Sequence, residues 1–281
     1  LEVGSWKLEV GSWKLEVGSW NFRAELGGFK PSAGSHRLAF RYGNQGDATS
    51  MHLTHCPQRL IPLSCPHFFT RQRRCPMAIT LPVDIDQVKG FLAEDEAAAL
   101  YRAAATLSAR APVLEIGSYC GKSTIYIGTA CKNSGGIVYA LDHHRGSEEH
   151  QLGEEYHDPD LFDGGAGLVD TFKEFRKNMR AAELEETVIP IVASSALASR
   201  HWSTPLSMVF IDGGHSMEAA MTDYRSWAGH IISGGILAIH DLFPNPDEGG
   251  QAPITIYRLA MASGLFEEVE VVNTLGLLRR L

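Results

Sequence analysis

The sequence predicts an α/β fold with a doubly wound parallel sheet over residues 77–281. Short segments that are apolar throughout alternate there with longer segments whose apolar residues recur at helical spacing. Continuously apolar strands are typical of a parallel sheet that is covered on both faces, and right-handed crossovers between them build a doubly wound fold. In such a fold, ligands bind beyond the carboxyl ends of the strands.

Seven segments are predicted strands. Five are short and apolar, and two more close the chain on either side of a turn at Asn273-Thr274. They are residues 113–116, 137–141, 188–192, 208–211, 235–240, 266–272 and 275–280. The third contains Pro190, which lacks the amide hydrogen that a central strand needs, so we expect this strand at an edge of the sheet.

Five segments are predicted helices that cover the two faces of the sheet. The first carries Ala97, Leu100, Tyr101, Ala104 and Leu107, and the second runs from Gly121 to Cys131. The third carries Leu168, Phe172, Phe175 and Met179, the fourth carries Ala220, Tyr224, Trp227, Ala228 and Ile231, and the fifth spans 254–263.

Residues 1–76 are expected to be an irregular leader, either disordered or not native to the protein. They open with nearly three copies of LEVGSWK, and the Gly and Ser inside each copy exclude a coiled-coil seam. Because the chain begins with Leu rather than Met, Met51 and Met77 are candidate start sites. A zinc site from the His and Cys residues between 52 and 75 is a weaker alternative, since the spacing C-x8-C-x9-C matches no compact zinc motif. A mitochondrial presequence is another, weakened by the Gly and Pro content.

The composition excludes several classes of protein. The leader carries a net charge of +5 and residues 77–281 a net charge of −13, and an acidic body argues against nucleic acid as the main partner. No apolar run is long enough to span a membrane, so we expect a soluble protein without a membrane partner. The five cysteines do not resemble a secreted disulfide framework, which favours a cytoplasmic location.

The stretch LEIGSYCGKST, residues 114–124, predicts a strand-to-helix turn that holds a nucleotide-like ligand. Gly117 and Gly121 permit close approach of a ligand, and the helix that follows offers free N–H groups. A P-loop needs glycine in place of Ile116 and a dinucleotide fingerprint needs glycine in place of Tyr119, so both matches fail. S-adenosylmethionine has no pyrophosphate, and Asp142 at the end of the next strand is suited to accept hydrogen bonds from its ribose.

Several acidic and histidine side chains fall at or just past predicted strand ends, and this convergence is the main functional signal. They are Glu115, Asp142, Asp212, His240 and Asp241. His215 follows Asp212 across Gly213-Gly214 in the stretch SMVFIDGGHS. Histidine is suited to act as a general base near neutral pH, and converging carboxylates are suited to bind a divalent ion.

The sequence resembles the class I S-adenosylmethionine-dependent methyltransferases over residues 80–281. Four motifs occur in the right order: E-x-G-x-x-x-G-K-S-T, a following strand that ends in Asp, IDGGHSMEAAMTDYRSW, and GGILAIHD. The subgroup with the fourth-strand motif I-D-G-x-H-S, which includes macrolide-sugar and cephalosporin-cluster O-methyltransferases, is the most similar. The resemblance implies a Rossmann-like seven-stranded sheet of order 3-2-1-4-5-7-6 with the last-entered strand antiparallel.

The resemblance also implies the site residues. Those for the cofactor are Glu115, Gly117, Ser118, Tyr119, Gly121, Ser123, Asp142, His143, Ser194, Ser195 and Asp212. Ser194 stands where the family commonly has Asp, which weakens the expected contact with adenine. His215 matches the family's candidate base and, with Asp212, is the expected catalytic pair. Asp212, His240 and Asp241 would bind Mg²⁺ or Mn²⁺, and His240, where Glu is usual, either shifts the preference toward Mn²⁺ or Zn²⁺ or leaves the site without metal.

These patterns predict an enzyme that transfers a methyl group from S-adenosylmethionine to a small-molecule acceptor, with a hydroxyl oxygen as the favoured atom. The long stretch 143–167 is expected to be a lid or acceptor-binding loop, with a solvated loop as the alternative. An NAD(P)-dependent Rossmann oxidoreductase and a non-catalytic cofactor-binding protein remain alternatives, as does a homo-oligomeric state. A hydrolase would need a G-x-S-x-G elbow, which the sequence lacks.

Overall fold

The computed structural model describes residues 7–10, 13–16, 79–147, 150–151, 153 and 157–281. The chain divides into two compact units, residues 1–71 and 72–281. In the first, β1 (Lys7–Val10) and β2 (Trp13–Glu16) pair antiparallel within the LEVGSWK repeat, where the sequence analysis assigned no strand. The zinc and start-site hypotheses concern residues outside the described ones.

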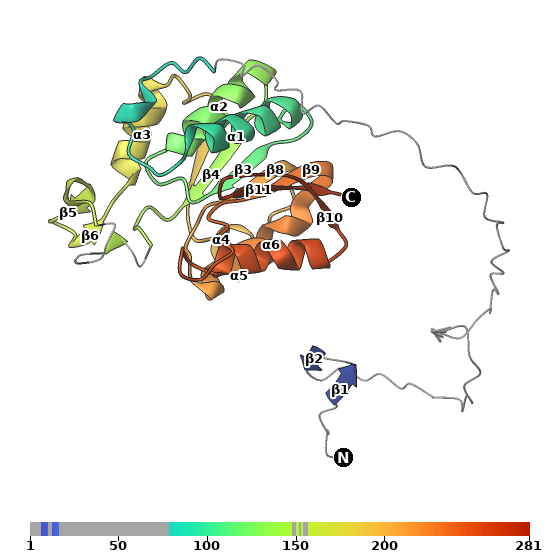
Figure 1. Cartoon of the computed structure of the whole chain (residues 1–281). Helices are drawn as coiled ribbons and strands as arrows, with labels where there is room; N and C mark the ends of the chain where they lie inside the picture. The colour runs from blue at the N-terminus through green and yellow to red at the C-terminus, as the bar shows by residue number, and fades with distance from the viewer. Residues whose placement is uncertain (1–6, 11–12, 17–78, 148–149, 152, 154–156) are drawn as a thin grey trace, which may run out of the picture. The chain divides into compact units, whose positions relative to one another are not determined.

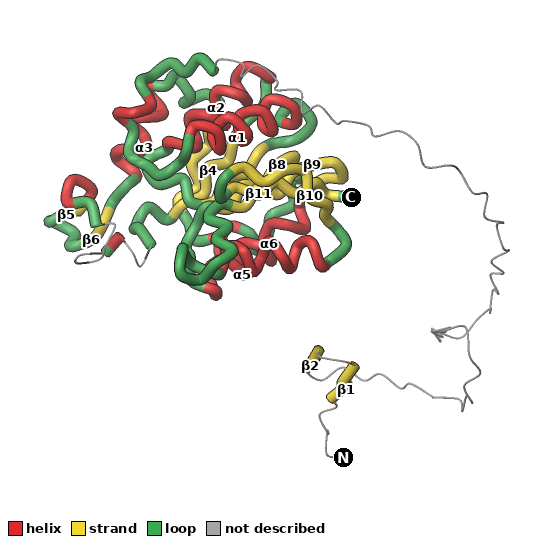
Figure 2. Tube along the Cα trace, viewed as in Figure 1, coloured by secondary structure: helices red, strands yellow, loops and turns green. Residues whose placement is uncertain are grey.

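The second unit is built on a seven-stranded sheet with the order β10-β11-β9-β8-β3-β4-β7 (Figures 1 and 2). Its strands are β3 (Val113–Ile116), β4 (Val138–Asp142), β7 (Val188–Val192), β8 (Leu206–Ile211), β9 (Ile231–Ile239), β10 (Phe266–Val272) and β11 (Leu275–Arg280). Strands β7, β4, β3, β8 and β9 pair in parallel, whereas β11 runs antiparallel to both of its neighbours. Numbered by entry, the order is 3-2-1-4-5-7-6. This confirms the predicted sheet, its antiparallel last strand and the edge position of Pro190.

Helices cover both faces of this sheet (Figure 1). On one face lie α1 (Glu94–Leu107), α2 (Lys122–Ser134) and α3 (Phe172–Ala181), and on the other α4 (Ser195–Ala198), α5 (Met217–Trp227) and α6 (Ala252–Ala262). Shorter elements are the 3₁₀ helices η1 (Ile85–Gln87), η3 (Pro159–Leu161) and η4 (Ala228–His230), and the hairpin of β5 (Phe162–Asp163) and β6 (Leu168–Val169).

Each face of the sheet has its own apolar core. Successive residues of β3 alternate between them, as the pleat of a strand requires: Val113 packs in the cluster that contains Leu100 of α1, and Leu114 packs in the cluster that contains Trp227 of α5. Among the described residues, none of the helices combines the length and the apolar composition needed to cross a bilayer.

Two apolar residues that the sequence analysis placed on helices lie in strands. Leu168 belongs to β6, and α3 begins only at Phe172, whose N–H donates to Asp170 Oδ1 at 3.0 Å. Ile231 opens β9, because α5 ends at Trp227 and a 3₁₀ turn follows. Ile231 is buried, and helical spacing alone does not distinguish a final helical position from the first residue of a buried strand.

Gly117 brings the loops after β3 and β8 into contact. Its φ of +88° lies in the left-handed region, and a Cβ atom there would lie 2.0 Å from the backbone oxygen of Asp212. Only glycine permits both the conformation and the close approach. Because β3, β4, β8 and β9 run parallel, their carboxyl ends meet at one edge of the sheet. The residues at that edge form the candidate site.

Candidate functional site

The turn after β3 is tied to the end of β4. Tyr119 has a φ of +45°, and its N–H donates to Asp142 Oδ2 at 2.8 Å. The N–H of His144 donates to Asp142 Oδ1 at 2.6 Å, so both carboxylate oxygens are held by backbone groups. His143 lies beside them with a half-exposed ring, 4.0 Å from Asp142 Oδ1. Asp142 is thus fixed in place, and each of its oxygens has a lone pair left to accept another hydrogen bond.

Glu115 lies beneath this turn and is fully buried. Its Oε2 accepts a hydrogen bond from the Thr124 hydroxyl, while Oε1 and the buried hydroxyl of Ser118 have no partner within the described part of the chain. Burial raises the pKa of Glu115 to about 7. The hydroxyls of Ser123 and Thr124 oppose this rise, and the charges of Asp212 and Asp142 add to it. Glu115 Oε1 and the Ser118 hydroxyl are therefore two buried polar atoms at this turn that lack a partner within the described part of the chain.

Gly121 ends the turn and is the N-cap residue of α2, with a φ of +92°. A side chain there would lie 2.6 Å from Cε of Met179 on α3. The turn is therefore confined between α3 and the end of β4, and the first N–H groups of α2 lie beside it.

Ser194 is the N-cap residue of α4 and Ser195 is the first residue of that helix, shortly after β7 ends. Trp227 Nε1 donates to Ser195 Oγ at 3.2 Å, and the Ser195 side chain lies close to Asp223. Sequence reasoning missed Asp223, a buried acid whose pKa burial raises to about 6, against the lowering effects of Ser195 and His143. A signal was available, because Asp223 falls on the buried face of its helix between Ala220 and Trp227.

The ends of β8 and β9 bring two carboxylates and two imidazoles together. His240 Nδ1 lies 3.1 Å from Asp212 Oδ1 and 3.5 Å from Asp241 Oδ1. The other carboxylate oxygen of Asp241, Oδ2, lies 2.9 Å from His215 Nε2. The sequence analysis grouped Asp212, His240 and Asp241 as metal ligands and paired His215 with Asp212, whereas the carboxylate beside His215 Nε2 is Asp241. The structure places Asp241 between the two histidines.

Glu96 of α1 is the third carboxylate at this cluster, and sequence reasoning missed it. Its Oε2 lies 3.0 Å from His240 Nε2 and accepts from the N–H of Ala93 at 3.2 Å. Its Oε1 accepts from the N–H and the hydroxyl of Thr274, at 2.9 and 2.8 Å. Glu96 was visible only as an acid among the apolar residues of a helix, and nothing in its spacing indicates a partner 144 residues away.

The charges in this cluster alternate in sign. Burial acts to lower the pKa of His240, but hydrogen bonds with Asp212 and Asp241 and their charges outweigh it and raise the pKa to about 11. Burial acts against the ionised form of Asp241 too, yet His215 and His240 hold its pKa well below the usual range. Hydrogen bonds from His240 and Thr274 likewise outweigh burial at Glu96 and lower its pKa.

Residues 114–242, from β3 to just past β9, match a family model described as a methyltransferase domain. This match identifies residues 114–242 as a methyltransferase domain. The matched stretch contains the glycine turn, Asp142, Asp212 and the pair that follows β9. Glu96 lies before it.

Solved methyltransferase structures are similar to this chain at low identity. The O-methyltransferase NovP is 16% identical, with 66% of this chain and 78% of that chain covered and a TM-score of 0.49. The O-methyltransferase TomG from Streptomyces achromogenes, solved in complex with S-adenosylmethionine, is 13% identical, with 68% and 81% covered and a TM-score of 0.47.

The donor set at the end of β8 and β9 fits a divalent metal ion. Asp212, His240 and Asp241 each offer one ligand atom, and these atoms lie within 4.8 Å of one another. The remaining atoms of two ligands are held from outside, His240 Nε2 by Glu96 and Asp241 Oδ2 by His215. Outer partners of this kind are typical of metal ligands in proteins. The methyltransferase domain thus has a candidate ion site beside its candidate base.

One hollow on the described part of the domain contains predicted site residues. It is lined by Asp212, Gly213, Gly214, His215 and His240, together with apolar residues such as Ile239 and Ile256. A Cβ atom at Gly213 would lie 2.8 Å from Asp223 Oδ2, so a larger residue there would displace that carboxylate.

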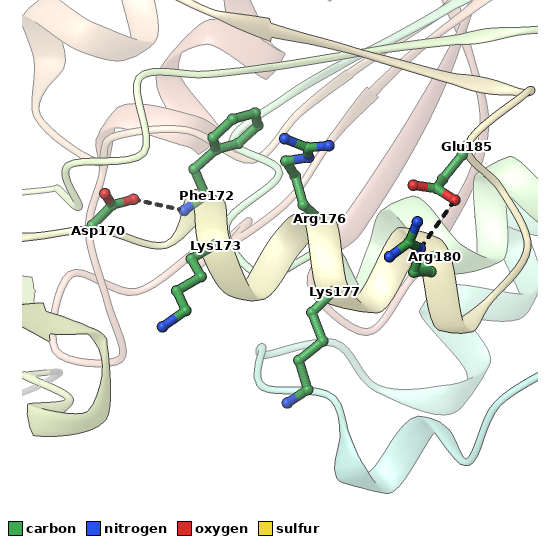
Figure 3. A pocket seen from close by; sticks show the side chains of 7 residues that line it. All are labelled: Asp170, Phe172, Lys173, Arg176, Lys177, Arg180 and Glu185. Atoms are coloured by element: carbon green, nitrogen blue, oxygen red, sulfur yellow. Dashed lines mark hydrogen bonds and ion pairs between the residues drawn. The ribbon is translucent and has the colours of Figure 1, made fainter.

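A wider hollow of about 420 Å³ runs along α3, away from these residues (Figure 3). Its lining is Asp170, Phe172, Lys173, Arg176, Lys177, Arg180 and Glu185. Arg180 pairs with Glu185 at 3.5 Å, and Figure 3 shows Lys173 and Lys177 extended away from the helix. No sequence-predicted site residue lines it.

Proposed function

We propose that the methyltransferase domain transfers a methyl group from S-adenosylmethionine to a hydroxyl oxygen of a small molecule, with His215 as the base. The observation that carries this proposal is the 2.9 Å pair of His215 Nε2 and Asp241 Oδ2, next to Asp212 at the carboxyl edge of the sheet. A histidine whose one nitrogen is held by a carboxylate is a suitable general base at neutral pH.

The charges at the strand ends favour S-adenosylmethionine over a dinucleotide. The donor carries a positive sulfonium and an ammonium group, and the turn around Gly117 lies among Glu115, Asp142 and Asp212. The same carboxylates would repel the pyrophosphate of NAD(P), which argues against the oxidoreductase alternative.

In this proposal several of the predicted cofactor residues face different parts of S-adenosylmethionine. Asp142 accepts hydrogen bonds from the ribose hydroxyls with the lone pairs that Tyr119 and His144 leave, and His143 lies alongside. Ser118 and the N–H groups near Gly121 and Ser123 face the methionine part. Ser194 lies on the adenine side, while Ser195, which accepts a hydrogen bond from Trp227 and lies close to Asp223, lies behind it.

The chemical step needs a proton acceptor close to the acceptor hydroxyl, because the sulfonium already activates the methyl group. If Nε2 of His215 donates its hydrogen to Asp241, the lone pair of the imidazole is on Nδ1. The hydroxyl proton passes to that nitrogen as the oxygen forms its bond with the methyl carbon and the sulfur takes the bonding pair. Asp241 stabilises the imidazolium that results.

We further propose that Asp212, His240 and Asp241 hold a divalent ion in the working enzyme. Such an ion, when bound, binds the acceptor oxygen and lowers the pKa of its hydroxyl. His215 lies next to this ion site through Asp241, so the base and the ion would act on one acceptor.

The test combines cofactor binding with methyl transfer in the full-length chain. Calorimetry with S-adenosylmethionine, and with NAD⁺ as the control, measures the cofactor, and a panel of phenols, sugars and small polyketides measures transfer. We expect His215→Ala to reduce transfer about 100-fold or more while the Kd for S-adenosylmethionine is unchanged. His201→Ala, an exposed histidine, is the matched control. Transfer by His215→Ala at the wild-type rate would remove His215 from the base role, and binding of NAD⁺ alone would refute the proposed donor.

A further inference from the structure

We infer that Glu96 is the positioning residue that makes the domain select a first-row transition ion such as Mn²⁺ over Mg²⁺. It does so by holding His240 with Nδ1 directed at Asp212 and Asp241. This inference rests on the ion site of the proposed function, and it assigns a role to a residue outside the matched stretch 114–242.

Glu96 is itself rigidly held. It is 3% exposed, and three donors other than His240 reach its carboxylate: the N–H of Ala93 and both the N–H and the hydroxyl of Thr274. Its two oxygens are therefore engaged from α1 and from the β10–β11 turn at once. A carboxylate fixed in this way cannot follow the imidazole if the ring rotates, so the ring must adapt to the carboxylate.

The position of Glu96 decides which nitrogen of His240 faces the other ligands. An ionised carboxylate only accepts hydrogen bonds, so Nε2, at 3.0 Å from Glu96 Oε2, carries the hydrogen. In the imidazole that binds an ion, the lone pair is then on Nδ1, which lies 3.1 Å from Asp212 Oδ1 and 3.5 Å from Asp241 Oδ1. Glu96 thus turns His240 into a nitrogen ligand on the side where the two aspartates converge.

A site with one imidazole nitrogen and two carboxylates discriminates between ions. Mg²⁺ prefers oxygen ligands and gains little from an imidazole, whereas Mn²⁺, Zn²⁺ and their neighbours accept nitrogen. Removal of an outer partner of a ligating histidine typically weakens metal binding by about 10- to 100-fold. Loss of the Glu96 carboxylate should therefore weaken Mn²⁺ binding far more than Mg²⁺ binding.

The experiment titrates the full-length, chelator-treated chain with Mn²⁺ alone and with Mg²⁺ alone, by calorimetry, without cofactor. We expect the wild type to bind Mn²⁺ more tightly than Mg²⁺, and Glu96→Gln to lose about 10- to 100-fold in Mn²⁺ affinity. Glu94→Gln makes the same change at an exposed position of the same helical turn and should behave as the wild type. Pulsed electron paramagnetic resonance of bound Mn²⁺ should detect the imidazole nitrogen in the wild type and show a weaker coupling in Glu96→Gln.

Thermal unfolding shows whether Glu96→Gln remains folded. If it does not, Thr274→Val removes one donor to Glu96 Oε1 and should give a smaller loss of Mn²⁺ affinity than the carboxylate replacement. Unchanged Mn²⁺ binding in the folded variant would overturn the inference, as would a wild type that binds Mg²⁺ as tightly as Mn²⁺. A wild type that binds neither ion overturns it as well. Calorimetry of the same sample with S-adenosylmethionine then tests separately whether the protein binds the proposed cofactor.

Discussion

Replacement of Glu115 by Gln should change how the stability of the domain depends on pH. In the folded protein burial raises the pKa of Glu115 to about 7, from a value of 4.5 for an unperturbed glutamate. The folded state therefore binds the proton more tightly than the unfolded state does. The resulting stabilisation is fully present below about pH 4.5 and is lost as the pH rises through about 7. At 1.36 kcal/mol per pKa unit, the full change is about 3 kcal/mol.

The assay is urea denaturation of the full-length chain, followed by far-UV circular dichroism at a series of pH values between about 4.5 and 8. Gln does not titrate, so the free energy of unfolding of Glu115→Gln minus that of the wild type should rise by about 3 kcal/mol across the full range. Asp223, another buried acid with a raised pKa, contributes to both proteins and cancels in the difference. Glu186→Gln, the same replacement at an exposed position, is the control. A constant difference for Glu115→Gln would refute the reasoning, because it would mean that the folded state does not favour the protonated carboxyl.

Two further predictions concern the turn and the base. Gly117→Ala should lower the free energy of unfolding by about 3 kcal/mol, because the new Cβ atom would lie 2.0 Å from the Asp212 backbone oxygen. A loss below about 1 kcal/mol in urea denaturation would contradict the close approach. Asp241→Asn should reduce methyl transfer at least about 10-fold without changing the Kd for S-adenosylmethionine, because His215 loses its carboxylate partner. Equal rates for the variant and the wild type would show that His215 does not depend on Asp241.

Local patterns were enough to predict the strands of the sheet, whereas the strand order was implied by the family resemblance. Apolar runs gave the seven strands, and Pro190 indicated an edge, because both signals depend on the residues of one segment. The predicted strand ends also placed Asp142, Asp212 and Asp241 at one edge, since the carboxyl ends of parallel strands meet there. The errors at Leu168 and Ile231 occurred where one apolar residue suits a helix end and a strand equally.

Contacts between distant segments could not be predicted from the sequence. His215 follows β8 and Asp241 follows β9, so their pairing depends on how two loops bend over adjacent strands. Glu96 contacts His240 from a helix on another part of the chain, and helical spacing reveals which face is buried but not which residue lies opposite. The candidate site was therefore predicted as a set of ligands, without the partners that fix their orientation.

The contacts of Glu96 have a consequence for the order of folding. Glu96 binds His240 and Thr274 across 144 and 178 residues, and contacts at such separations close very large loops of chain. The entropy lost in closing these loops makes such contacts late events on a folding pathway. A partly folded chain that has formed β3, β4 and the glycine turn would still lack the contact with Glu96 that orients His240. We therefore expect the cluster around His240 to be completed only when the hairpin of β10 and β11 docks on β9.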